Sequence, residues 1–338
     1  MRVLLIFIFF TSIIVTAQVG GEKSYAFLNI STSARQNALG GKTLTLLNDV
    51  NQPLWNAALI NQSIDNQLAV NYSSYLAGIH IGSLSYARMI SRRFGTIHGG
   101  IKYINYGMLT QADENGTITG TFSANDLVLS AGYAINLPWT NFYAGANLKL
   151  INSSISSYSS FGIATDFSLL YYNPYQSYVF TLVFRNMGTQ IKSFNATREG
   201  LPFEIALGAS YQLENVPMKW HFTLDNLQQW KVAVSNPSNQ SSDLEGNVTE
   251  EKIGFLNNAL RHVIVGVELF PENAVNLRLG YNFRKSQEYK LQNVRTFGGI
   301  SFGFGLKMNA FKFNYAFSKV HTASNVSTFS LQIDLDKK

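Results

Sequence analysis

The stretch Ala-Val-Asn-Leu-Arg-Leu-Gly-Tyr-Asn-Phe-Arg, residues 274–284, decides the fold class. Successive side chains of a strand point to opposite faces. One face would therefore carry only uncharged, mostly apolar residues: Val275, Leu277, Leu279, Tyr281 and Phe283. The other would carry polar or small residues: Asn276, Arg278, Gly280, Asn282 and Arg284. A tilted strand needs about nine to eleven residues to cross a bilayer, so this pattern predicts one strand of an outer-membrane β-barrel.

The composition agrees with a barrel. Charged residues make up 14% of the 338 residues, against roughly 25% in soluble domains, and aromatic residues make up 13%. After the N-terminus no run approaches the ~18 apolar residues of a membrane-spanning helix. The absence of cysteine excludes disulfides and thiolate metal sites. The net charge of +6 is spread without Lys/Arg clusters, so we expect no nucleic-acid partner.

The chain divides into three predicted parts. Residues 1–17 have the charged start, apolar core and Val-Thr-Ala end of a signal peptide. Residues 18–63 lack alternation and are predicted to be an N-terminal plug or periplasmic segment. A free tail would expose Leu39, Leu44 and Trp55 to water, which favours the plug over the tail. Residues 64–338 form the predicted barrel.

Alternation predicts about fourteen antiparallel strands, an even number as in bacterial barrels. They lie near 65–75, 78–90, 94–107, 124–136, 139–152, 159–172, 177–187, 202–214, 217–227, 260–270, 274–285, 294–307, 309–319 and 325–336. The connections alternate between short turns and longer loops, and the prolines fall at the short turns: Pro138, Pro174, Pro217 and Pro271. Aromatic residues beside these turns predict an interfacial girdle: Trp139, Tyr171, Tyr172 and Trp220.

Glycines are predicted to line the lumen and to leave room for a plug or a narrow passage; the sequence does not distinguish these two contents. The predicted positions are Gly99, Gly145, Gly280, Gly299, Gly303 and Gly305.

No motif indicates catalysis. The five histidines lie on separate predicted elements without metal-site spacing, and no nucleophile motif is present. The glycines of residues 299–305 lack the lysine and the helix of a phosphate loop, so they are interpreted as part of a strand. We expect a protein without catalytic residues, metal or cofactor.

The longest predicted loop, residues 228–259, is the predicted partner-binding region, because loops of this length commonly have a role of their own. The candidate contact residues are Trp230, Asp243, Glu245, Ile253 and Phe255. Thr249-Glu-Glu followed by Ile253 and Phe255 resembles the start of a short helix. The apolar residues of the loop could dock on the barrel rim or on a partner.

Several stretches carry a family resemblance: residues 20–42, Asp225-Asn-Leu-Gln-Gln-Trp-Lys231, Phe255-Leu-Asn-Asn-Ala-Leu-Arg-His262 and Gly266-Val-Glu-Leu-Phe-Pro271. They resemble the PorV/PorQ family of outer-membrane proteins of the type IX secretion system, whose broader relatives are FadL-like barrels. The resemblance implies fourteen strands around an N-terminal plug, and it supplies no active-site residues. Residues 48–58 loosely resemble the transporters' Asn-Pro-Ala region, with Ala57 in place of the proline.

The resemblance also implies a function. We expect a non-enzymatic outer-membrane component of the attachment complex, with loops at the cell surface, that anchors the surface protein PorZ near the sortase PorU. PorV and lipopolysaccharide would be neighbours in the same complex. Two alternatives stay open: a FadL-like transporter of hydrophobic small molecules, and a PorV-like shuttle that binds the C-terminal signals of cargo.

Overall fold

The computed structural model describes residues 23–91, 94–138, 140–195, 197–233, 241–242, 248–249, 253–289, 297–321 and 324–337. The predicted signal peptide and Trp139 lie outside the described residues.

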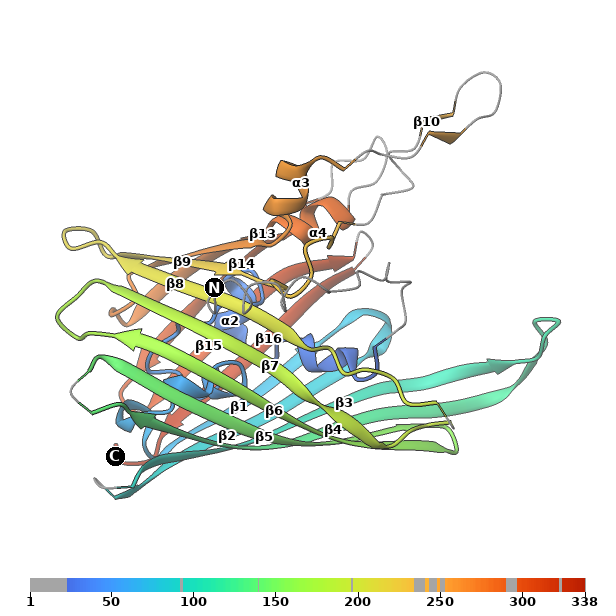
Figure 1. The fold of residues 1–338 in the computed structure, drawn as a ribbon, viewed down its shortest axis with the longest axis horizontal. Coiled ribbons are helices and arrows are strands. Elements are labelled where there is room, and N and C mark those ends of the chain that lie inside the picture. The colour runs from blue at the N-terminus through green and yellow to red at the C-terminus, as the bar shows by residue number, and fades with distance from the viewer. Residues whose placement is uncertain are drawn as a thin grey trace, which may run out of the picture.

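In the described part of the chain, fourteen antiparallel strands close into one barrel (Figure 1), which confirms the predicted fold class. The strands are β1 (Gln67–Ser74), β2 (His80–Ser91), β3 (Gly95–Ala112), β4 (Ile118–Asn136), β5 (Phe142–Ile155), β6 (Tyr158–Tyr172), β7 (Tyr178–Lys192), β8 (Glu204–Gln212), β9 (Met218–Leu224), β12 (Val263–Leu269), β13 (Val275–Asn282), β14 (Ile300–Met308), β15 (Phe311–His321) and β16 (Ser324–Asp334). Each pairs with its neighbour along the chain, and β1 pairs with β16 to close the wall. A separate hairpin, β10 (Ser241–Ser242) with β11 (Val248–Thr249), lies between β9 and β12 in the chain.

The two faces of the wall differ as the alternation predicts. In β13, Val275, Leu277 and Leu279 are exposed on the outside, whereas Asn276 and Arg278 are buried inside. The predicted extension of this strand through residue 285 is wrong. A short helix, α4 (Phe283–Glu288), begins there, because the Asn282 side chain accepts a hydrogen bond from the Lys285 backbone N–H and caps it.

Short turns and the C-terminus lie at one end of the barrel, and the longest connections, those after β7, β9 and β13, lie at the other end (Figure 1). We call these the turn end and the loop end. The predicted longer loop between β5 and β6 is wrong, because the two strands pair up to Ile155 and Tyr158 and only residues 156–157 connect them. All four predicted turn prolines fall in turn-end connections between strands. The predicted loop at residues 108–123 is wrong, because β3 and β4 stay paired from Met108↔Ser123 to Ala112↔Ile118 and project as a hairpin.

The turn end carries Tyr171 and Trp220 of the predicted girdle on its outer surface. The prediction is wrong for Tyr172, which faces the lumen and packs with Leu47 and Tyr143, because successive side chains of β6 alternate between the two faces. The rings of Phe142 and Tyr171 lie 5.2 Å apart, and those of Tyr171 and Tyr178 stack at 6.1 Å. Trp220 stacks on Phe222 at 6.2 Å. Aromatic side chains at this level suit a membrane–water interface, where one part of the ring meets lipid and another meets water.

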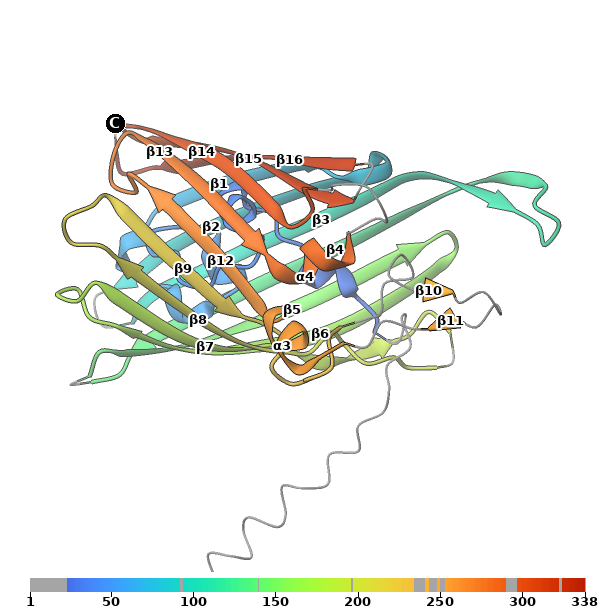
Figure 2. The ribbon, with the colours of Figure 1, turned by 90° about the horizontal axis from the view of Figure 1, so that it is seen from above.

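Residues 23–66, the luminal segment, lie inside the barrel (Figure 2). The segment contains five short helices: η1 (Ala26–Asn29), α2 (Ala34–Ala38), η2 (Gln52–Leu54), η3 (Ala57–Leu59) and η4 (Gln62–Ile64). A further one, η5 (Leu76–Gly78), connects β1 to β2. Backbone N–H groups of the luminal segment donate to wall hydroxyls, for example from Ala34 to Ser330 at 2.8 Å and from Ala58 to Ser168 at 2.7 Å.

Wall glycines let the luminal segment approach closely. A Cβ added at Gly280 would lie 2.1 Å from the backbone N of Gly40, and one added at Gly145 would lie 2.3 Å from the carbonyl carbon of Ala57. Two of the predicted lumen positions are wrong. Gly99 is exposed on the outer face because the register places Gly100 inside, and Gly299 precedes β14 with a φ of +81°.

These contacts predict that Gly280→Val destabilises the barrel by about 1–3 kcal/mol, because the added methyl groups would overlap the backbone of Gly40. The measurement is urea unfolding of the protein in lipid vesicles. Gly99→Val is the matched control, since nothing lies within 4 Å of a Cβ there. Equal stability of the two variants would contradict a tightly filled lumen.

Candidate functional site

The predicted partner-binding residues fall into two groups. Trp230, Ile253 and Phe255 are described, and they belong to the connection between β9 and β12 at the loop end. Asp243 and Glu245 lie outside the described residues. The predicted helix is present as α3 (Phe255–Leu260), but it begins at Phe255 after Gly254 rather than at the Thr249-Glu-Glu stretch.

Trp230 and Phe255 are in direct contact. Their ring centroids lie 4.8 Å apart, and the Trp230 ring stacks on His262 at 5.6 Å. Both aromatic side chains are nevertheless exposed on the protein surface, Trp230 by 49% and Phe255 by 75%. The next residue, Leu256, is 70% exposed. We call Trp230, Phe255 and Leu256 the aromatic cluster.

Buried polar contacts hold the base of the aromatic cluster. The Asn258 side chain donates to the Trp230 carbonyl and accepts from the backbone N–H groups of Val232 and Ala233, both at 3.2 Å. The ring nitrogens of His262 lie 2.6 and 3.1 Å from the carbonyl oxygens of Asp225 and Trp230. The backbone polar groups beneath the exposed rings are therefore hydrogen-bonded to side chains.

Ion pairs connect this base to the lumen. Asp225, just before the cluster, bonds Arg284 of α4 at 2.5 Å and Lys42 of the luminal segment at 3.0 Å. Lys42 also bonds Glu204 of β8 at 2.5 Å, and Glu204 bonds Arg185 at 2.9 Å. The loop end, α4 and the luminal segment thus share one chain of charges that continues into the lumen.

A second set of charges surrounds Glu268 of β12, which is fully buried. Its carboxylate accepts two hydrogen bonds from Arg35 of α2, at 2.8 and 2.7 Å, and one from Arg278 of β13 at 2.8 Å. His221 of β9 lies 3.3 Å away. Sequence reasoning placed Arg278 in the lumen but missed its partners, because Arg35 and Glu268 are 233 positions apart.

Among the residues that the structure describes, two cavities beside the luminal segment and away from the turn end are small. One cavity between the luminal segment and the wall, lined in part by Leu28, Trp55 and Lys102, measures about 30 Å³. Another, beside Gly40 and Ser301, measures about 10 Å³. Each has room for about one or two water molecules. Deep in the lumen, the Arg185 guanidinium lies 3.7 Å above the Trp55 ring and bonds the Leu28 carbonyl at 3.2 Å.

The histidines take part in packing contacts. His98 lies 2.9 Å from the Val50 carbonyl, and His221 lies 2.9 Å from the Thr45 hydroxyl. Across the described ranges, no group of three or more His, Cys, Asp or Glu residues is arranged to hold a metal ion. A search of the same residues finds no helix with the length and apolar character of a membrane span.

Comparison with solved structures gives the fold. No family model matches the chain, and no curated protein matches it. A mutant of TodX, a monoaromatic hydrocarbon channel, superposes with a TM-score of 0.52 at 13% identity over 89% of this chain and 96% of that one. TbuX, a toluene transporter of Ralstonia pickettii, gives 0.50 at 12% identity over 90% and 97%.

The fold is a closed β-barrel of the kind seen in these two structures. By their descriptions, TodX is a channel and TbuX is a transporter, and neither is an enzyme. At 12–13% identity these similarities concern architecture only. The resemblance to the PorV/PorQ family stays a prediction.

The Glu268 contacts predict that Glu268→Gln lowers stability by roughly 3–5 kcal/mol, because removing the carboxylate leaves buried guanidinium groups without their counter-charge. The midpoint of thermal unfolding in detergent measures the loss. Glu272→Gln, on the exposed turn after β12, is the control and should unfold like the unmodified protein. Equal midpoints for both variants would show that this buried cluster contributes nothing to stability.

Proposed function

We propose that this protein is a filled outer-membrane barrel that holds a partner protein at its loop end. The observation that carries the proposal is the aromatic cluster, in which an exposed Trp230 and an exposed Phe255 contact each other above a hydrogen-bonded base. Short turns face the periplasm and longer loops face outside in barrels of this kind, so the cluster would face the cell surface.

The chemistry of the aromatic cluster suits protein recognition. Tryptophan and other aromatic residues carry a large share of binding energy at protein interfaces. Because Asn258 and His262 already pair the polar backbone beneath Trp230, a partner would bury the rings with little loss of freedom in the loop. Asp243 and Glu245 would contribute charged contacts from the same connection.

The filled lumen supports a positional role over a passage. The luminal segment bonds to the wall on several sides, and the cavities beside it deep in the lumen measure about 10 and 30 Å³, far below a ligand site of about 300–1,000 Å³. The larger cavities that its residues line, of about 470 and 560 Å³, lie at the turn end. A barrel of this kind would act by confining its partner at the membrane, which raises the local concentration of that partner near other components.

The finer assignment follows the resemblance in the sequence. The partner would be PorZ, held near the sortase PorU in the type IX secretion attachment complex, with PorV and lipopolysaccharide as neighbours. The stretches Asp225–Lys231 and Phe255–His262, which carry part of the resemblance, are the ones that build the aromatic cluster and its base.

The double variant Trp230→Ala/Phe255→Ala is expected to weaken PorZ binding by more than tenfold, because truncating an aromatic hot spot costs about 2 kcal/mol or more. Binding of purified PorZ to the detergent-solubilised barrel measures the affinity. Release of PorZ into the culture medium, with the barrel at its normal level, measures the same loss in cells.

Tyr175→Ala is the matched control, because Tyr175 is an aromatic residue exposed at the turn end. It should retain PorZ. Retention of PorZ by the double variant as well would remove the aromatic cluster from the mechanism. Capture of many cargo proteins in place of one partner would support the PorV-like shuttle.

The transporter alternative rests on the fold similarity and on an apolar hollow of about 480 Å³ in the outer wall, lined in part by Phe180, Leu207 and Phe222. Transport would require the luminal segment to leave its place and open a path from this hollow. We expect cells that lack the gene to take up radiolabelled toluene at the normal rate while PorZ is released. Slower uptake with PorZ retained would favour the transporter.

A further inference from the structure

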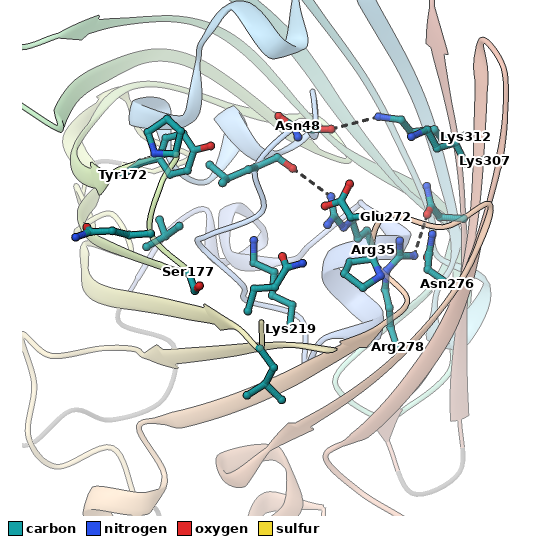
Figure 3. A pocket seen from close by; sticks show the side chains of 18 of the residues that line it. Arg35, Asn48, Tyr172, Ser177, Lys219, Glu272, Asn276, Arg278, Lys307 and Lys312 are labelled. Carbon is teal, nitrogen blue, oxygen red and sulfur yellow. Dashed lines mark hydrogen bonds between the residues drawn. The ribbon is translucent and has the colours of Figure 1, made fainter. Parts of the chain in front are cut away.

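A polar cavity of about 470 Å³ opens at the turn end (Figure 3). Its residues come from both the wall and the luminal segment, which contributes Arg35, Leu47 and Asn48. We call this cavity the turn-end vestibule. Its volume lies in the range of small-ligand and peptide pockets, unlike the small cavities deeper in the lumen.

Basic side chains dominate the vestibule. Arg35 and Arg278 already bond the buried Glu268. Three lysines do not have such a partner. Within the part of the chain that the structure describes, the side-chain ammonium groups of Lys219 and Lys307 make no hydrogen bond or salt bridge, and that of Lys312 reaches only the Asn48 carbonyl at 3.4 Å. These ammonium groups come from different parts of the wall, β9 and the β14–β15 hairpin, as Figure 3 shows.

A buried amide in the same wall also lacks a partner. Asn276 of β13 is 7% exposed, lines the vestibule, and its Oδ1 atom accepts no hydrogen bond. A buried acceptor without a donor is unfavourable. The burial of this atom also seals it from the cavity, so Asn276 contributes a polar wall beside the lysines and not a contact with a ligand.

The acidic residues of the vestibule lie on one side. Glu214 belongs to the turn between β8 and β9, and Glu272 belongs to the turn between β12 and β13; both are exposed. Lys307 and Lys312 flank the next turn, between β14 and β15. An elongated ligand would thus place most of its negative charges toward Lys307 and Lys312, whereas Lys219 of β9 lies on the side of the two glutamates.

We propose that the turn-end vestibule binds an acidic peptide segment of a periplasmic protein. Carboxylates of the segment pair with Lys219, Lys307 and Lys312. Cations spread over separate parts of the wall suit several carboxylates along a chain better than one compact anion. This site lies at the opposite mouth from the aromatic cluster, so it goes beyond the function proposed above.

The test uses the full-length barrel in detergent and a fluorescein-labelled hexaglutamate peptide. We expect saturable one-to-one binding by fluorescence anisotropy that weakens as salt rises, because exposed charges are screened. The triple variant Lys219→Gln/Lys307→Gln/Lys312→Gln should bind about tenfold more weakly, from up to about 1 kcal/mol per exposed charge pair.

The matched control removes the same charge at the loop end, with Lys23→Gln/Lys192→Gln/Lys319→Gln. It should bind the peptide as the unmodified barrel does. Heat-dependent gel migration checks that each variant is folded. Absence of binding, equal losses in both triple variants, equal binding of hexalysine, or displacement by inorganic phosphate at matched charge would each overturn the proposal.

Discussion

Every second side chain of the wall points into the lumen, and the charges placed there need partners because an unpaired buried ion is costly. Glu268 illustrates the constraint, because its fully buried carboxylate forms salt bridges with Arg278 of the wall and with Arg35 of the luminal segment. Lys42 likewise joins Glu204 to Asp225. Some of these pairs lie within the wall, such as Arg185 with Glu204, but Arg35 and Lys42 find their carboxylates only across the boundary between the luminal segment and the wall.

Features that follow from the two-residue alternation of side chains along a strand could be predicted from the sequence. Alternation in residues 275–282 fixes which side chains meet hydrocarbon, and the same rule gave the closed barrel of fourteen strands. Features that depend on distant partners could not. The hairpin beyond Met108 was interpreted as loop, although Asp113 accepts backbone hydrogen bonds from Asn115 and Thr117 and forms a tight turn there. Asn282, a helix-capping residue before Phe283, was the available signal for α4.

The candidate site shows the same division. Trp230, Ile253 and Phe255 were identified because apolar residues in a long connection are unusual, and the structure brings Trp230 and Phe255 into contact. Asn258 and His262, which hold the base, carry no local signal, since their role arises only when Asp225 and α3 lie side by side. The two mouths consequently differ in character, with exposed rings at one and unpaired ammonium groups at the other.

The enclosed N-terminal stretch also constrains biogenesis. The wall closes where β1 meets β16, with Gln67 opposite Asp334, and the enclosed residues immediately precede β1. They touch strands from both ends of the chain, including Ser168 of β6 and Ser330 of β16. Sealing the seam first would require threading this stretch through a mouth afterwards. We therefore expect the sheet to form around residues 23–66 before β1 and β16 pair and close the barrel.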